Sequence, residues 1–331
     1  MPKPIHRAGL PRRALLAGIP ATLAVPAIHG ASAQGTWPNK PVRIIYNYAP
    51  GGAGDALSRP WAERLTRAFG VPFVVENRGG ASGTIGAEAG VRATPDGYTI
   101  LFSPNSALNV VPQLRKVGYE AKKDLIAVAR LGDIVGGFGV VASLGINTMA
   151  ELVAYAKKNP GKLVFGTPGL GTSTHLRLEM LKLRAGIDIL GVPYRGSGDA
   201  MIDLLAETIH MMNEIVIYPH VKSGKLKLLA VNHPARHWDF PDTPTMTEAG
   251  FPNSDVPIWF GAYLPRGTAP EIVGTLNRKI VELSQLPETT ASLRTIGFTP
   301  ALGTPEEMAI FFEQDWDANT LVIRDAKITM G

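Results

Sequence analysis

The chain is 331 residues long, contains no cysteine and carries a net charge of +5. Without cysteine it forms no disulfide, no thiolate metal site and no cysteine nucleophile. Four of the five net charges come from residues 1–33, which hold four basic residues and no acidic one, so residues 34–331 carry only +1. A nucleic-acid partner is not expected, because such partners need clustered basic residues. The 45% apolar and 18% charged composition is typical of a soluble globular protein.

The first 33 residues have the order of an export signal. Basic residues end at Arg12-Arg13, an apolar stretch runs from Ala14 to Ile28, and Ala31-Ser32-Ala33 precedes Gln34. We therefore predict cleavage near Ala33, by either the general or the twin-arginine route, which the sequence leaves open. The apolar stretch is too short for a membrane-spanning helix, which needs about 20 residues. The mature protein is predicted to be exported and soluble.

The mature chain begins with alternating strands and helices. The β-branched and aromatic run at 42–48, stopped by Pro50-Gly51-Gly52, predicts a strand, and the helical spacing of Leu57, Trp61 and Leu65 predicts the helix after it. Strand, helix and strand in succession favour parallel pairing. In the first part of the chain we expect strands at 42–48, 71–75 and 98–102 and helices at 55–68 and 85–93.

The middle of the chain repeats this alternation before long helices take over. Thr148 and Glu151 form a predicted capping box at the start of a helix. Strands are expected at 164–165, 189–193, 209–214 and 226–231, and helices at 148–158, 172–185, 199–206, 270–283 and 305–323.

Two stretches of such alternation predict an α/β protein with two lobes and a cleft between them. Glycine and proline collect at 132–139 and 234–244, where we expect the chain to cross between lobes. Lobe 1 is predicted to comprise residues 34–135 and 239–331, and lobe 2 residues 136–238.

Catalytic and metal-binding motifs give little support to an enzyme. The sequence contains no nucleotide-phosphate loop, no G-x-S-x-G elbow and no H-E-x-x-H pair. His233 and His237 are separated by Pro234, so we expect ordinary surface histidines. Glu313, Asp315 and Asp317 are expected to form a solvated helical face. No cofactor and no metal are predicted. His175 is either a base beside Ser173 or Thr174, or a side chain that packs or hydrogen-bonds locally.

Glycine- and hydroxyl-rich turns that lead into helices are abundant instead. They occur at 50–55, 79–84, 169–174 and 195–198, each after an expected strand. Such a turn directs free backbone N–H groups and the positive end of a helix dipole at one point. Ligands of open α/β sheets bind at the carboxyl ends of strands. The sequence therefore predicts a site for a small anion, and a carboxylate fits better than phosphate, for which more arginine and lysine would be expected.

Several blocks resemble the Bug family, the periplasmic solute receptors of tripartite tricarboxylate transporters (TctC-like). They are PGGxxD at 50–55, VENRGGASGTIGAEAGVRATPDGYTILF at 75–102, VPYRGSGDA at 192–200 and DTPTMTEAGFP at 242–252. The resemblance implies a two-lobed periplasmic binding protein, type II-like, with a cleft between two βα domains. Such a receptor is not an enzyme: it captures a mono- or dicarboxylate (aromatic and amino acids included) and delivers it to membrane transporter subunits. We expect a monomer.

The same resemblance implies the ligand-binding positions. The two carboxylate-holding loops correspond to Gly51–Asp55 and Ser82–Thr84. The full expected set is Gly51, Gly52, Ala53, Gly54, Asp55, Ser82, Gly83, Thr84, Ser106, Ala107, Thr172, Ser173, Thr174, Tyr194, Arg195, Gly196 and Glu214.

One segment departs from the family pattern. Residues 207–214 read ETIHMMNE, whereas the sequences of the family usually resemble GQVDLMFD at this place. His210, Asn213 and Glu214 therefore stand where the family pattern has Asp, Phe and Asp. We hypothesise that Glu214 accepts a hydrogen bond from a ligand amine, hydroxyl or bound water. Two alternatives stay open: an exported hydrolase or lyase that uses His175 with Ser173 or Glu214, and a receptor that feeds a sensor. The ligand itself is not identified.

Overall fold

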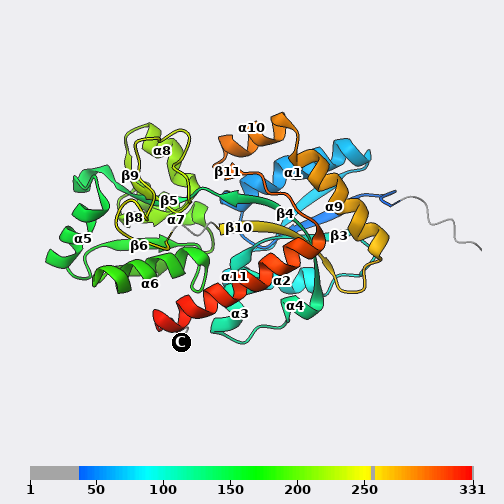
Figure 1. The fold of residues 1–331 in the computed structure, drawn as a ribbon, viewed down its shortest axis with the longest axis horizontal. Helices are drawn as coiled ribbons and strands as arrows, with labels where there is room; N and C mark the ends of the chain where they lie inside the picture. Colours follow the sequence, from blue (N-terminus) through cyan, green and yellow to red (C-terminus); the bar gives the residue numbers. More distant parts are fainter. Residues whose placement is uncertain (1–36, 255–257, 330–331) are drawn as a thin grey trace, which may run out of the picture. The chain divides into compact units, whose positions relative to one another are not determined.

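The computed structural model describes residues 37–254 and 258–329, so the predicted export signal lies outside the described ranges. Two β-sheets carry the fold (Figure 1). The first has six strands in the order β11-β4-β10-β3-β1-β2. Strands β1, β2 and β3 are parallel, whereas β10 runs antiparallel to β3 and β4, and β11 antiparallel to β4. Their bounds are β1 (Val42–Tyr46), β2 (Phe73–Asn77), β3 (Thr99–Pro104), β4 (Leu125–Ile134), β10 (Ile258–Pro265) and β11 (Phe298–Thr299).

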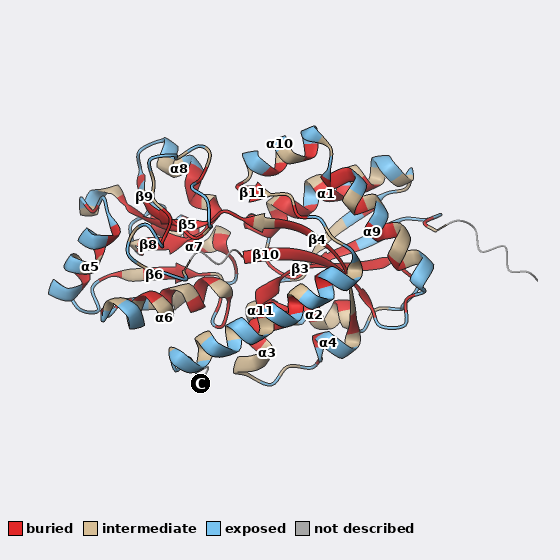
Figure 2. Cartoon of the chain, viewed as in Figure 1, coloured by how far each residue is buried: buried red, intermediate tan, exposed pale blue. Residues whose placement is uncertain are grey.

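Helices cover both faces of this first sheet. Ile44 packs in one core with α1 (Ala53–Phe69) and α9 (Pro270–Ser284), and the adjacent Ile45 packs in another with α2 (Thr84–Val91) and α11 (Pro305–Asp325). Successive side chains of a strand point to opposite faces, so a strand covered on both faces is apolar throughout. That explains the continuous apolar run from which β1 was predicted in the sequence. Figure 2 shows the buried strands between partly exposed helices.

The second sheet has five strands in the order β7-β6-β8-β5-β9. Phe165 on β6 packs with α5 and α6, and Met212 on β8 packs in the core that includes α7. The bounds are β5 (Gly137–Val141), β6 (Val164–Thr167), β7 (Leu190–Pro193), β8 (Met211–Asn213), β9 (Leu226–Val231), α5 (Met149–Lys158), α6 (Ser173–Ala185), α7 (Ser197–Leu205) and α8 (Tyr218–Lys222).

The chain passes from the first sheet to the second between β4 and β5. After β9 it stays with the second sheet, because Thr245 pairs with Val231 and Met246 and Phe251 pack in the core of that sheet. We therefore propose that lobe 2 comprises 136–254 and lobe 1 comprises 37–135 with 258–329. This return point lies later than residue 238, where glycine and proline content alone had suggested it.

Several elements were not predicted. The long strands β4 and β10 lie side by side between β11 and β3 in the first sheet, and α10 (Pro287–Thr295) follows α9. The capping box at α5 is only half formed: Thr148 accepts from the Glu151 amide at 3.1 Å, but the Glu151 carboxylate accepts from the Asn147 amide. A complete box begins α11, where Thr304 and Glu307 cap each other. In the described ranges we find no helix with the length and apolarity needed to cross a membrane.

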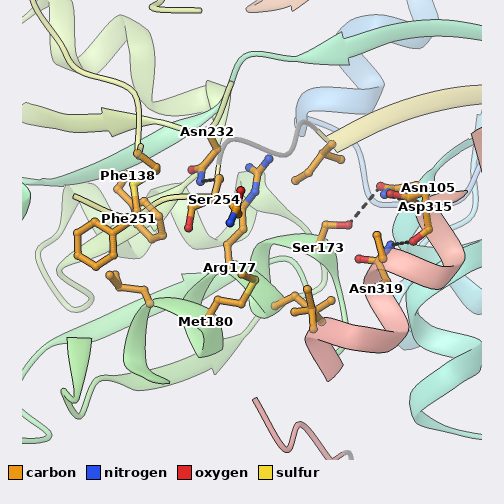
Figure 3. A pocket seen from close by; sticks show the side chains of 17 residues that line it. Asn105, Phe138, Ser173, Arg177, Met180, Asn232, Phe251, Ser254, Asp315 and Asn319 are labelled. Carbon is orange, nitrogen blue, oxygen red and sulfur yellow. Dashed lines mark hydrogen bonds between the residues drawn. The ribbon is translucent and has the colours of Figure 1, made fainter. Parts of the chain in front are cut away.

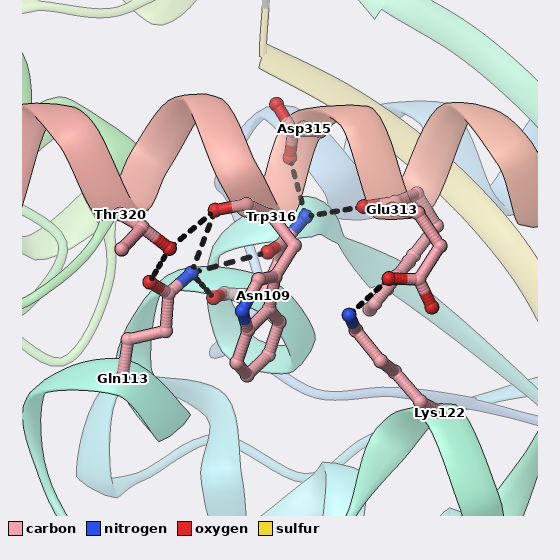
Figure 4. A network of polar contacts seen from close by, with 8 residues as sticks. Asn109, Gln113, Lys122, Glu313, Asp315, Trp316 and Thr320 are labelled. Atoms are coloured by element: carbon pink, nitrogen blue, oxygen red, sulfur yellow. Dashed lines mark hydrogen bonds and ion pairs between the residues drawn. The ribbon is translucent and has the colours of Figure 1, made fainter.

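One predicted feature of α11 is wrong. Asp315 does not lie on a solvated face: it is buried, and its Oδ2 accepts from Asn109 Nδ2 at 2.7 Å (Figure 4). Burial raises the pKa of this carboxyl, and the amide donors around it, Asn105 first, partly oppose that rise. Gln113, which follows Asn109 by one turn, donates to the Trp316 carbonyl. These bonds fix the segment Ser106–Val110, directly after β3, against α11.

Candidate ligand-binding site

Three helices from the two lobes begin at one cavity. α1 contributes Gly52 and Ala53, α6 contributes Thr172 to Thr174, and α7 contributes Gly196 and Ser197. The void measures about 440 Å³ with its open mouth included. Its lining is Tyr46, Tyr48, Ala49, Gly52, Ala53, Pro104, Ser106, Ile134, Pro168, Thr172, Ser173, Thr174, Gly196, Ser197, Glu214, Ile258 and Phe260.

The helix N-termini supply the positive potential of this cavity. The N-cap residues of α1 and α7 are Gly52 and Gly196, and neither has a side chain to occupy the first backbone N–H groups. Those N–H groups are therefore available to a ligand, and the dipole of each helix favours an anion there. The described lining contains no lysine and no arginine. The arrangement suits a small anion held by backbone donors and hydroxyls.

Glu214 is the carboxyl group in this lining. It is only 4% exposed, and its Oε1 accepts from the Thr174 hydroxyl at 3.0 Å. Its Oε2 makes no hydrogen bond of good geometry among the described residues, although the Ser197 hydroxyl and the Ile215 backbone N–H lie close enough to the carboxyl to lower its pKa. Burial raises the pKa of Glu214 above its ordinary value, while the Thr174 hydroxyl and the guanidinium of Arg177 act in the opposite direction. Burial lowers the pKa of Arg177 to about 10, so this arginine remains cationic at neutral pH.

Comparison with known proteins identifies the family. Residues 57–328 match the tripartite tricarboxylate transporter family receptor, TctC. This chain belongs to the TctC receptor family. It is 34% identical over 318 residues to protein BugT of Bordetella pertussis, covering 94% of this chain and 97% of BugT.

Two solved structures support the same assignment. A periplasmic binding protein, BugD, has 30% identity and a TM-score of 0.84, and an R. palustris protein solved with adipate has 31% identity and a TM-score of 0.86. Each comparison covers 88% of this chain and 99% of the other. The resemblance predicted from the sequence and the two-lobed α/β fold are thereby confirmed, and the protein is a solute-binding receptor of the TctC family.

The receptor's first glycine loop is organised by Asp55, which does not line the cavity. The Asp55 carboxylate accepts from the Gly51 amide at 3.2 Å and from Asn77 Nδ2 at 2.9 Å, and it pairs with Arg59 at 3.0 Å. Gly54 lies against the wall behind the cavity: a Cβ there would come within 2.4 Å of the Tyr46 ring. Of the expected residues Gly51 to Asp55, the lining includes Gly52 and Ala53.

The second expected loop lies behind the lining as well. Ser82 donates from its hydroxyl to the Leu170 carbonyl of lobe 2 at 2.7 Å, and its own carbonyl accepts from the Tyr48 hydroxyl at 2.9 Å. Gly83 has φ of +86° and passes under the Tyr48 ring, where a Cβ would lie 2.7 Å away. Thr84 donates to the Ala81 carbonyl. This loop thus supports Tyr48 and joins the two lobes.

The remaining expected residues divide in the same way. Ser106, Thr172, Ser173, Thr174, Gly196 and Glu214 line the cavity, whereas Ala107 is buried behind it. Tyr194 donates to Asp203 at 2.6 Å within lobe 2, and the Arg195 side chain is 86% exposed beside Asp199. Asn213 and His210 make hydrogen bonds inside lobe 2. Of the substituted residues in the 207–214 segment, Glu214 is the one in the lining.

Two tyrosines in the lining were not anticipated. Tyr46 ends β1 and Tyr48 follows it, so both side chains lie on the same side of the strand and reach the cavity. Burial raises the pKa of both phenols. They are therefore neutral hydrogen-bonding groups at neutral pH. Their alternation at the carboxyl end of the first predicted strand is the signal that could have indicated them.

A second cavity adjoins the first at Ser173 and Ile258 (Figure 3). It measures about 710 Å³ with its open mouth included, and apolar side chains of α6 and α11 line it together with polar ones, among them Arg177 and Asp315. Ser173 donates from its hydroxyl to Asn105 Oδ1 at 3.2 Å, which joins lobe 2 to lobe 1 beside this cavity. Because the three helix N-termini meet at the smaller cavity, we assign the candidate site there.

Two histidines of the described ranges, His175 and His237, make local contacts. His175 Nδ1 accepts from the Gly171 amide at 3.2 Å, the local role that the sequence left open. His237 is buried, which corrects the expected surface position; it packs on Tyr218 and Phe240, and burial lowers its pKa to about 4. Across 37–254 and 258–329, no three histidine, aspartate or glutamate side chains gather closely enough to hold a metal ion.

Proposed function

We propose that this receptor captures a small carboxylate in the 440 Å³ cavity and delivers it to the membrane subunits of a tripartite transporter. The observation that carries the proposal is the meeting of three helix N-termini at a lining without lysine or arginine. Backbone donors and helix dipoles bind an anion without a side-chain cation. The adipate in the R. palustris structure is a carboxylate ligand of a protein with 31% identity to this one.

The cellular setting follows from the same proposal. The predicted export signal, cleaved near Ala33, would place the mature receptor in the periplasm as a monomer, without a nucleic-acid partner. Closure of the two lobes around the ligand would then shift the receptor between open and closed populations. A membrane subunit that binds the closed form more tightly than the open form would then bind receptors that carry a ligand.

The contacts of the hydroxyl and imidazole groups favour a receptor over the hydrolase or lyase alternative. Ser173 donates to Asn105, and His175 Nδ1 accepts from a backbone amide, so each polar group is engaged with a different partner. A nucleophile needs a base within hydrogen-bond reach. We therefore propose binding without chemical change of the ligand.

Calorimetry on protein stripped of carried-over ligand by unfolding and refolding tests this function. Mono- and dicarboxylic acids of three to eight carbons and aromatic acids form the panel, and the matched primary amides are the controls. We expect at least one acid to bind with 1:1 stoichiometry and its amide to bind much more weakly. Absence of binding by every acid, or equal binding of an acid and its amide, would contradict the proposal.

A further inference from the structure

The buried carboxyl of Glu214 in the cavity lining points to a more specific ligand class. Building on the proposed function, we infer that the cavity selects a monocarboxylate with a hydrogen-bond donor away from its carboxylate, and that Glu214 disfavours a second carboxylate. A hydroxyl or ammonium group would serve as the donor. Adipate, which has a carboxylate at each end, would then be a poor ligand here.

The position of Glu214 supports this role. Glu214 directly follows β8, and its neighbour Thr174 belongs to the first turn of α6. The Thr174 hydroxyl fixes Oε1. Oε2 is buried and makes no hydrogen bond of good geometry, although the Ser197 hydroxyl and the Ile215 backbone N–H lie close enough to lower the pKa of the carboxyl. A buried acceptor without a donor of good geometry is stabilised when a ligand supplies that donor.

The charges around the cavity support the rejection of a second carboxylate. Arg177 is the buried cation whose charge acts on Glu214, and it also donates to Asn213 Oδ1 at 2.7 Å. This cation offsets the charge of Glu214 itself. The helix N-termini are then left to balance one ligand carboxylate. A second carboxylate would lie in the same low-dielectric cavity as Glu214, where like charges repel strongly.

The side chains near Glu214 offer few other compensating groups. The Ser197 hydroxyl of α7 and the Ile215 backbone N–H are close enough to lower the pKa of Glu214, and both are neutral donors. The tyrosines Tyr46 and Tyr48 from lobe 1 and Tyr218 from lobe 2 are kept neutral by burial. These groups donate hydrogen bonds but add no positive charge. The selectivity therefore depends on whether Glu214 is charged and accepts a bond.

Four acids of equal chain length separate the possibilities: hexanoate, 6-hydroxyhexanoate, 6-aminohexanoate and adipate. Calorimetry at pH 7.5 on full-length mature protein should show the hydroxy and amino acids binding at least about tenfold more tightly than adipate, a difference of about 1.4 kcal/mol. In Glu214→Gln, 6-aminohexanoate should weaken and adipate should strengthen, each by about tenfold. Glu271→Gln makes the same change in charge at an exposed position of α9 and should leave the ranking unchanged.

The following results would overturn parts of the inference. Preference of the wild-type protein for adipate over 6-aminohexanoate overturns the selectivity, and an unchanged ranking in Glu214→Gln overturns the role of Glu214. If Glu214→Gln does not fold, the wild-type ranking alone decides. Failure of these four acids together with the wider acid panel overturns the proposed function as well, whereas binding with adipate preferred overturns only the inference.

Discussion

Replacing Thr174 with valine tests the buried bond on which the account of Glu214 depends. Thr174 is 1% exposed and its hydroxyl lies 3.0 Å from Glu214 Oε1. Valine has nearly the same shape and lacks the donor. Hydrogen bonds to charged groups contribute about 1.5–3 kcal/mol, so at pH 7.5 we expect the free energy of unfolding to fall by about 2 kcal/mol.

The pH dependence of that loss follows from the pKa of Glu214. Because the folded pKa is raised above the ordinary value of 4.5, the folded protein binds the proton more tightly than the unfolded chain. This group therefore costs stability above its folded pKa, and the cost disappears as the pH falls through that pKa toward 4.5. In Thr174→Val the cost is larger at high pH. At low pH, where Glu214 is neutral, the difference between variant and wild type should shrink to about 1 kcal/mol, the value of a neutral bond.

Urea unfolding of ligand-free protein at a series of pH values between 5 and 8 measures this difference. Thr208→Val, at an exposed turn of the same lobe, makes the same chemical change without a buried partner and is the control. A loss below about 0.5 kcal/mol at pH 7.5, or a loss that is the same at every pH, would refute the reasoning.

Two further substitutions test how the site is built. Gly54→Ala would place a Cβ 2.4 Å from a β1 tyrosine ring and should abolish acid binding in the calorimetric assay. Gly274→Ala is the control, because a Cβ at this helical position meets only the flexible end of an arginine side chain, and it should preserve binding. Equal affinities of the two variants would contradict the close fit behind the cavity. Ser82→Ala removes a 2.7 Å hydrogen bond between the lobes and should weaken ligand affinity two- to tenfold, about 0.5–1.5 kcal/mol. Ser223→Ala, which loses only a local hydrogen bond, is the control and should leave the affinity unchanged. An unchanged dissociation constant for Ser82→Ala would show that the Ser82 bond does not favour closure.

Local sequence patterns predicted the elements that local chemistry determines. The apolar run of β1, the helical spacing of α1 and the glycine turns before helices all arise from residues close together in the chain. β10 was missed because it comes from far along the chain and inserts antiparallel between β3 and β4. Asp315 was misplaced for a related reason, since only tertiary packing shows that its helix face meets Asn105 and Asn109.

For the candidate site, the sequence likewise predicted which loops take part but not how their side chains are oriented. Loops that begin helices could be identified because glycine and hydroxyl residues mark them, and Gly52, Thr172 and Gly196 do line the cavity. The orientation of individual side chains could not be predicted. Asp55 turns inward to organise its own loop, and Arg195 turns to solvent. The apolar side of the lining, Ile134, Ile258 and Phe260, depends on how distant strands meet.

Mass spectrometry of the small molecules released when the purified protein is denatured tests the central claim most directly. Protein produced with export and purified without unfolding should release one carboxylic acid at a stoichiometry approaching one per chain, and Gly54→Ala purified in parallel should release little. The same acid added back to stripped protein should be recovered chemically unchanged after long incubation. Release of no acid from well-folded protein, or conversion of the added acid to a product, would contradict a carboxylate receptor.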